Sequence, residues 1–587
     1  MIPLKTKFLL LLAGFLFCHA FFALHKAALG FDFTDEGVHL AWPMGLLFGE
    51  KLFAREIGTL IRLCQLVPFL ILKLHPSTTL YEFRLVGWAL HLAAFSALSL
   101  CLFRLSRAPL LSLLVPSVPF FASNTLTLIV PSYDPTSSDL LVVFFSLRML
   151  AVFFGPPRRL WLNALAGGAL FLAVLCYPPL LAIAGLIFIV DIIDLCRSRT
   201  KAAPWTRAGA SNLASLFTYA LCGIGFGGYL FFSGTLARWH ERIPLVRSFA
   251  LSSLHQNPFE FYAGLAGFFF THSRFFLLVS LSALLVLPAM IVGRRLYPGG
   301  EWRYLTHGFA VLSLAGLSVV YFCDYDYLAS FFSLTGIALT GLYLGIGGES
   351  CDESEGALKL CVLLSAVASL IYSTSTTFYT AYFSLKIGAL GLPFCYSVSL
   401  IRLVNPRGIK FAFSAVYMPI LLGAAVLELG NFYYHSVYRD APPPQLTAVF
   451  SIPKLQQIKS TPERVRGVEE LYYYMKPRIR YGEPLLVYDD CPVLYYLLDA
   501  KPAYGLTWAR QNDISLATLQ TLAAEFASQP MPRYAIRTVV DVSKNDWPHA
   551  ARMHYEHYPL NDTVMANYEL EKTIFPFEVW RLKPGKE

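Results

Sequence analysis

The stretch Phe31-Asp32-Phe33-Thr34-Asp35-Glu36-Gly37-Val38-His39-Leu40 is the point from which the rest of the chain can be interpreted. It follows the first long apolar run, which extends from about residue 8 to 29 and has Lys5 and Lys7 before it. A run of this length predicts a helix that crosses a membrane, because crossing takes about 20 residues. It exceeds the roughly 7–15-residue core of a signal peptide, so we expect it to be retained. Acidic side chains therefore stand where the chain first emerges on the far face.

The composition is typical of a multi-pass membrane protein. Of 587 residues, 56% are hydrophobic and 14% are charged, against about 25% charged in soluble domains. Apolar runs recur through residues 1–430 and then stop, which predicts a polytopic α-helical protein with about thirteen transmembrane helices. The net charge of +9 comes from Lys and Arg residues that punctuate these runs. That pattern indicates membrane orientation and argues against nucleic acid as a partner.

The positions of the predicted helices give the chain its topology. Spans are predicted near residues 8–29, 84–103, 108–122, 140–154, 160–177, 179–196, 213–232, 275–292, 309–323, 327–346, 358–372, 383–403 and 412–429. With a cytoplasmic N-terminus, most basic clusters fall inside, and the loops at 30–79, 123–139 and 233–273 fall on the outer face. Residues 30–79 predict one or two interfacial helices; the alternative, a short span near 60–74, would invert everything after it.

The tail, residues 431–587, has a different composition and is long enough for its own core. Helices are predicted at 463–475 and 514–526, and strands at 484–488, 535–542 and 577–582. This alternation predicts a small α/β domain, which the odd number of spans places on the extracytoplasmic side. It contains no glycine-rich nucleotide-binding motif, so nucleotide binding is not predicted.

Two outer loops carry the candidate catalytic acids, Asp35 and Glu36 in the first and Asp134 and Asp139 in the second. Transfer of a glycosyl group to a hydroxyl needs a base for the acceptor proton, and carboxylates from separate loops can act as base and positioner. A divalent cation shared by Asp35 and Asp134 is an alternative arrangement. Each acid also has a structural explanation, as a helix cap or a turn residue.

Further side chains are candidates for substrate and phosphate binding. His39 follows Asp35 by four residues, which on a helix places both on one face. The outer loop after residue 233 is basic, against the usual orientation rule, and arginine suits phosphate because its fork donates two parallel hydrogen bonds. The alternative is a helix that contacts anionic lipid headgroups. The candidates in this region are Arg238, Arg242, Arg247, His272 and Arg274.

These features resemble the GT-C superfamily of integral membrane glycosyltransferases, in the branch with protein O-mannosyltransferases and lipid A aminoarabinose transferases. In the first loop, the residues that carry this resemblance are Asp35-Glu36-Gly37 and the segment at 45–53. In the tail, the segments at 492–498 and 501–504 are similar to those of bacterial members. The resemblance implies Asp35 as base, a second-loop acid, a polyprenyl-phosphate sugar donor and inversion at the anomeric carbon. It also implies a location in the bacterial inner (plasma) membrane. A WWDYG motif is absent from the sequence, which argues against an oligosaccharyltransferase catalytic subunit.

The sequence therefore predicts a membrane glycosyltransferase that moves a sugar from a polyprenyl-phosphate donor to a hydroxyl of a glycan, lipid or protein outside the cytoplasm. A transporter or flippase of a lipid-linked saccharide is the alternative, and would place ionisable residues at mid-membrane. A third possibility is a noncatalytic scaffold that displays the tail, in which the outer acids are replaceable.

Overall fold

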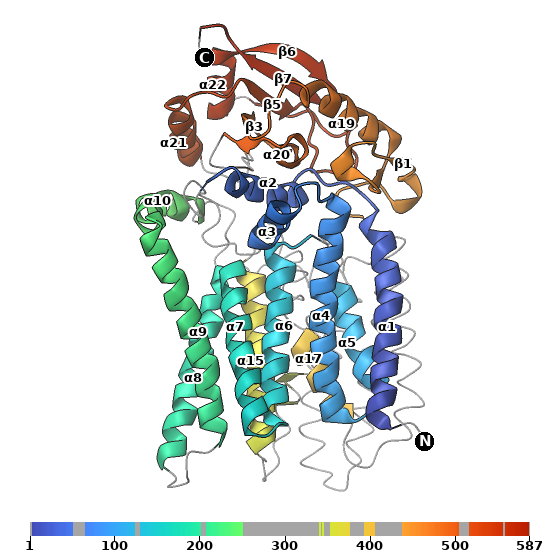
Figure 1. Cartoon of the computed structure of the whole chain (residues 1–587), viewed down its shortest axis with the longest axis vertical. Helices are drawn as coiled ribbons and strands as arrows, with labels where there is room; N and C mark the ends of the chain where they lie inside the picture. The colour runs from blue at the N-terminus through green and yellow to red at the C-terminus, as the bar shows by residue number, and fades with distance from the viewer. Residues whose placement is uncertain are drawn as a thin grey trace, which may run out of the picture.

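The computed structural model describes residues 3–50, 65–123, 130–200, 207–250, 340–341, 343–344, 353–375, 393–404, 437–503, 507, 516–555 and 558–585. Within these residues, a set of long helices is capped at one end by a domain that contains a sheet (Figure 1). The spans predicted at 275–292, 309–323 and 412–429, and most of the one at 327–346, lie outside the described residues.

The long helices run along one common direction (Figure 1). Five described helices are long and apolar enough to cross a membrane, within α1, α4, α6, α7 and α9. The helices of this part are α1 (Leu4–Ala27), α4 (Leu80–Ser106), α5 (Leu111–Ser123), α6 (Tyr133–Val152), α7 (Pro156–Cys176), α8 (Leu181–Thr200), α9 (Arg207–Phe232), α15 (Glu353–Ser375) and α17 (Pro393–Val404), with the short η3 (Pro178–Leu180) before α8. Many apolar side chains on these helices remain exposed, such as Phe17 and Phe232, as expected for surfaces that face lipid.

Three shorter helices lie at the end of the helical part next to the tail domain: α2 (Asp35–Leu47), α3 (Leu66–Leu74) and α10 (Thr235–Ala250) (Figure 1). The nine residues of α3 are too few to cross a membrane, which needs about 20. Buried side chains of this region pack in one core with the tail domain, for example Met44 and Leu72 with Leu471. The first loop is therefore enclosed between the two parts of the chain.

The tail domain contains a five-stranded sheet in the order β4-β3-β5-β7-β6. The strand β3 is parallel to β4 and β5, whereas β7 is antiparallel to β5 and β6. The predicted strand at 577–582 matches β7, and the predicted helix at 463–475 matches α19 to within one residue. The elements are η6 (Pro443–Gln445), β1 (Ala448–Val449), η7 (Pro453–Leu455), β2 (Lys459–Ser460), α19 (Pro462–Met475), β3 (Pro484–Val487), α20 (Val493–Leu498), β4 (Lys501–Pro502), α21 (Leu516–Ala527), β5 (Tyr534–Thr538), α22 (Pro559–Asn567), β6 (Tyr568–Ile574) and β7 (Phe577–Leu582).

Backbone contacts join the first loop to the tail domain at two places. The Gly30 N–H donates to the Lys459 carbonyl (2.8 Å), and the Lys459 N–H donates to the Ala28 carbonyl (2.7 Å). The Val493 N–H, at the start of α20, donates to the Phe33 carbonyl (3.3 Å). Here α2 and α20 approach so closely that a Cβ on Gly37 would lie 2.5 Å from the Val493 backbone nitrogen. A glycine at this position is required by packing between the two domains.

Gly37→Ala tests this close approach. We expect the variant to lose about 1–3 kcal/mol of stability, the usual cost of overpacking, and to expose the tail domain to limited proteolysis. Gly168→Ala in α7 is the matched control, because a Cβ there meets nothing within 4 Å and alanine favours a helix by about 1 kcal/mol. Equal thermal midpoints and equal protease resistance in the two variants would contradict the prediction.

Candidate functional site

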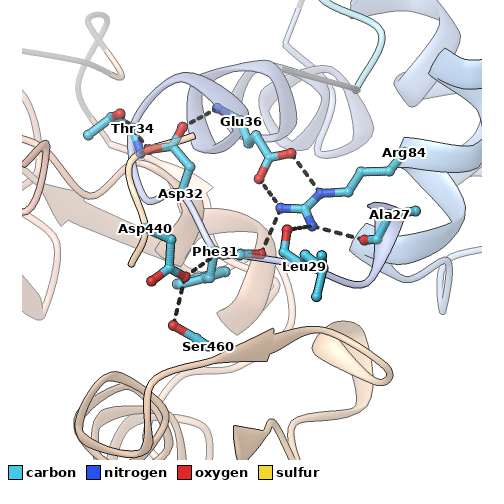
Figure 2. A network of polar contacts seen from close by, with 10 residues as sticks. Ala27, Leu29, Phe31, Asp32, Thr34, Glu36, Arg84, Asp440 and Ser460 are labelled. Carbon is cyan, nitrogen blue, oxygen red and sulfur yellow. Dashed lines mark hydrogen bonds and ion pairs between the residues drawn. The ribbon is translucent and has the colours of Figure 1, made fainter. Parts of the chain in front are cut away.

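A buried ion pair between Glu36 and Arg84 holds the first loop against α4 (Figure 2). The Arg84 Nε donates to Glu36 Oε1 (2.8 Å) and Nη2 donates to Oε2 (2.5 Å), in a bidentate arrangement. The same guanidinium donates to the carbonyls of Ala27, Leu29 and Gly30, at 2.9–3.1 Å. These carbonyls follow the last turn of α1, where a helix leaves acceptors unpaired and favours a cation. Glu36 and Arg84 thus tie together α1, α2 and α4.

The start of α2 is capped by Asp32. Its Oδ1 accepts from the Thr34 N–H (3.1 Å) and hydroxyl (2.8 Å), and its Oδ2 accepts from the Glu36 N–H (2.9 Å) (Figure 2). Burial raises the pKa of Asp32 from 3.8 to about 6, against the opposing effect of the Arg439 charge. Because Asp32 supplies the cap, helix capping does not account for the carboxylate of Asp35.

Asp35 occupies the first turn of α2 and is only partly buried. Its Oδ2 accepts a hydrogen bond from the Tyr438 hydroxyl and lies 3.2 Å from the Arg439 Nη2. In the part of the chain that the structure describes, both contacts use Oδ2.

Tyr438 and Arg439 are held in place by the residue that follows them. Asp440 is buried and accepts from the Phe31 N–H (2.7 Å) and the Ser460 hydroxyl (2.7 Å) (Figure 2). It also accepts from the Arg464 guanidinium. Arg464 is itself buried and donates to the carbonyls of Trp547 (2.9 Å) and Asn545 (2.6 Å). This network joins the first loop to the tail domain.

The second predicted acidic loop lies at the same end of the molecule as the first. The rings of His39 on α2 and Tyr133 at the start of α6 are 5.7 Å apart, and His39 is buried between Tyr133 and Trp42. Asp134 stands in the first turn of α6, but its side chain is outside the described part of the structure. Asp139 lies one to two turns further along α6, where its Oδ1 is 2.9 Å from Nδ1 of His91 on α4.

The predicted phosphate-binding residues are only partly described. Arg238 lies on the exposed surface of α10, at the same end as α2 (Figure 1). Arg242 and Arg247 belong to the same helix, but their side chains are not described, and His272 and Arg274 lie outside the described residues. The described residues include no group of three or more His, Cys, Asp or Glu side chains arranged to hold a metal ion. A metal shared by Asp35 and Asp134 stays a prediction, because the Asp134 side chain is not among them.

Sequence reasoning missed the roles of Arg84, Tyr438 and Arg439. The spacing places Arg84 at the start of a predicted span, where a cation is ordinarily a membrane-interface residue. One residue, Ala441, separates Tyr438-Arg439-Asp440 from Pro442-Pro443-Pro444, and this pair of charges beside a run of prolines is the available signal. Neither pattern reveals the contacts themselves, which span 48 positions between Arg84 and Glu36 and 403 between Tyr438 and Asp35.

No protein-family model matches the chain, and no curated protein is similar to it at a significant level. Solved structures are similar in overall architecture. ArnT from Cupriavidus metallidurans covers 98% of this chain and 98% of its own, at 12% identity and a TM-score of 0.42. Its complex with undecaprenyl phosphate covers 99% of both chains at 12% identity, with a TM-score of 0.41. The archaeal oligosaccharyltransferase AglB from Archaeoglobus fulgidus, in complex with an inhibitory peptide and a dolichol-phosphate, covers 86% of this chain and 66% of its own at 10% identity, with a TM-score of 0.44. Likeness at this level leaves residue roles to be argued from the site itself.

The two neighbouring acids of α2 have different environments, and substitution separates them. Glu36→Gln leaves the buried Arg84 without its charge partner, and breaking a buried ion pair costs about 3–5 kcal/mol. Asp35→Asn changes a partly exposed group, so we expect a thermal midpoint close to that of the wild type. The measurement is thermal unfolding of both purified variants in one detergent. A stable Glu36→Gln protein would show that the pair does not hold the loop.

The raised pKa of Asp32 predicts a pH dependence of stability. Between about pH 4 and pH 6, Asp32 binds a proton in the folded protein but not in the unfolded chain, since its folded pKa is about 6 and its ordinary value 3.8. Its contribution therefore becomes more favourable as the pH falls through this window. Relative to Asp32→Asn, the thermal midpoint of the wild type should rise between pH 7 and pH 4. A constant difference between the two proteins across that range would contradict the assignment.

Proposed function

We propose that this protein is a membrane glycosyltransferase that moves a sugar from a polyprenyl-phosphate donor to an acceptor hydroxyl, with Asp35 as general base. The observation that carries the proposal is the environment of Asp35. The adjacent acids are committed to structure, Asp32 to capping α2 and Glu36 to Arg84, whereas Asp35 is partly exposed and both of its described contacts use Oδ2.

The position of α2 supports a substrate that is held in lipid. Asp35 begins a helix that lies beside the ends of α4 and α6, both of which are apolar enough to cross a membrane (Figure 1). A donor with its chain in the bilayer presents its phosphate and sugar at this depth. A carboxylate at this place can meet an acceptor hydroxyl beside the sugar of such a donor.

In the proposed reaction, an acceptor hydroxyl loses its proton to Asp35 and attacks the anomeric carbon, and the bond to the phosphate oxygen breaks. The configuration of the sugar inverts, because the acceptor attacks the face opposite to the leaving group. Cations stabilise the departing phosphate, and the basic residues between Arg238 and Arg274 are proposed for this role. Asp134, at the start of α6, is proposed to position the acceptor or to share a divalent cation with Asp35. The acceptor, a glycan, lipid or protein, is proposed to enter on the side of the tail domain, outside the cytoplasm.

One feature would favour the alternative of a transporter. Arg148 on α6 and Asp191 on α8 form a buried ion pair between membrane helices, with Nη1 2.9 Å from Oδ2, and ionisable residues at such depth often mark transport pathways. The two charges neutralise each other and join two helices, however, which is a sufficient structural role. If the protein is a transporter, purified protein in vesicles should move a lipid-linked saccharide across the bilayer in the absence of any acceptor.

Asp35→Asn tests the proposal directly. A general base contributes about 10²–10⁴-fold to rate, so we expect turnover to fall by about that factor while folding and membrane insertion persist. The measurement is transfer of labelled sugar from a polyprenyl-phosphate donor in membranes that contain each variant. Glu569→Gln is the matched control, because Glu569 is an exposed acid on β6 of the tail. If Asp35→Asn turns over at nearly the wild-type rate, Asp35 is not the general base.

A further inference from the structure

Arg439 reaches the catalytic loop from the opposite end of the sequence. Its Nη2 lies 3.2 Å from Asp35 Oδ2, and its Nη1 donates to the Thr34 hydroxyl. The guanidinium also lies over the Tyr438 ring, 5.0 Å from its centre. Among the residues that the structure describes, Arg439 is the cation in direct contact with the proposed base, whereas the Arg84 guanidinium is occupied by Glu36 and by main-chain carbonyls.

The backbone conformation of Arg439 directs its side chain toward the first loop. Arg439 has a left-handed conformation (φ 51°), which is unfavourable for a residue with a Cβ. The conformation is fixed from both sides, because Arg464 Nη1 donates to the Arg439 carbonyl (3.1 Å) and the next residue, Asp440, is buried in the network with Phe31 and Ser460. Strained conformations of this kind concentrate at functional sites.

Carboxylates lie near Arg439. Burial lowers the pKa of Arg439, but the neighbouring Asp35, Asp32 and Asp490 outweigh it and hold the pKa above its ordinary value. Its side chain remains partly exposed, at 19%. The guanidinium is thus partly exposed and is held by the carboxylate that, in the proposed reaction, accepts a proton.

We propose that Arg439 is the residue that binds the phosphate of the lipid donor, and that it exchanges Asp35 for that phosphate when the donor enters. This inference rests on the proposed function and deepens it. The two N–H groups that now contact Thr34 and Asp35 form a fork that fits two oxygens of a phosphate. Transfer of the fork to phosphate frees Asp35 from its ion pair at the moment when the anomeric carbon is in place. Binding of the donor thus frees the base that takes the proton of the acceptor hydroxyl.

The exchange assigns different roles to two groups of arginines. Arg238 lies exposed on α10 and belongs to the basic residues proposed above to stabilise the departing phosphate. Arg439 is fixed beside the base. We therefore expect only Arg439 to couple the binding of phosphate to the release of Asp35 from its ion pair.

The first test is binding of a labelled polyprenyl phosphate to the full chain in lipid nanodiscs. Arg439→Gln removes charge-assisted hydrogen bonds, so we expect affinity to fall about tenfold or more. Arg439→Lys keeps the positive charge but not the two parallel N–H groups, so its affinity should lie between those of Arg439→Gln and the wild type. If Arg439→Gln does not fold, Arg439→Lys provides the test in its place. Arg581→Gln, an exposed arginine on β7 with its side chain 49% exposed, is the matched control. Wild-type affinity in both Arg439 variants would overturn the proposal.

The second test addresses the exchange. If Asp35 competes with phosphate for Arg439, Asp35→Asn should bind the polyprenyl phosphate more tightly than the wild type, and this gain should vanish in Asp35→Asn/Arg439→Gln. If Arg439 only positions Asp35, Asp35→Asn will not bind more tightly, and the exchange is wrong. Inorganic phosphate as competitor, and nanodiscs with or without phosphatidylglycerol, separate recognition of a prenyl phosphate from that of free phosphate or bulk anionic lipid.

The outcomes also separate this inference from the proposed function. No binding of polyprenyl phosphate to the wild type would remove the donor class and, with it, both proposals. Binding by the wild type, loss of turnover in Asp35→Asn and undiminished binding in the Arg439 variants would leave the glycosyltransferase intact and remove only the role of Arg439.

Discussion

The arrangement of the first loop depends on the buried ion pair between Glu36 and Arg84. A guanidinium and a carboxylate this far from water are tolerated only when every hydrogen bond is satisfied, and here the carbonyls at the end of α1 take the remaining N–H groups of Arg84. The pair therefore fixes the end of one membrane helix, the start of another and the first turn of α2 at once. Asp35, the residue directly before Glu36, is therefore held in a defined position although it is not a member of the ion pair.

A second constraint comes from the tail domain, which encloses the loop on its other side. Asp440 and Arg464 form a buried pair, and Asp440 also accepts from the backbone of the loop through Phe31. The tail is thus a structural part of the candidate site. It places Tyr438 and Arg439 against Asp35. The membrane helices without the tail domain would therefore lack part of the candidate site.

Sequence patterns predict the secondary structure well and the site incompletely. The spans within α1, α4, α6, α7 and α9 follow from apolar length, since the bilayer imposes it, and the strand at 577–582 follows from its apolar and β-branched residues. The importance of the Asp35–Glu36 pair follows from its place after the first span. What distinguishes the two acids does not, because the partners of Glu36 and Asp35 lie 48 and 403 positions away. Pairing across such separations is decided by the tertiary fold, and local sequence periodicity contains no information about it. The same limit applies to Asp139, whose contact with His91 no spacing rule anticipates.

The contact between Gly30 and Lys459, with Asp440 beside it, closes a loop of more than 400 residues. During synthesis, the N-terminal helix enters the membrane long before the residues that complete the loop leave the ribosome. The acidic stretch that contains Asp32, Asp35 and Glu36 therefore stays uncovered at the bilayer surface until the last quarter of the polypeptide has been synthesised and has folded onto it. A chain that is truncated or stalled in translation would carry all its acids and yet lack the scaffold that orders them, so assembly of the centre reports completion of the whole molecule.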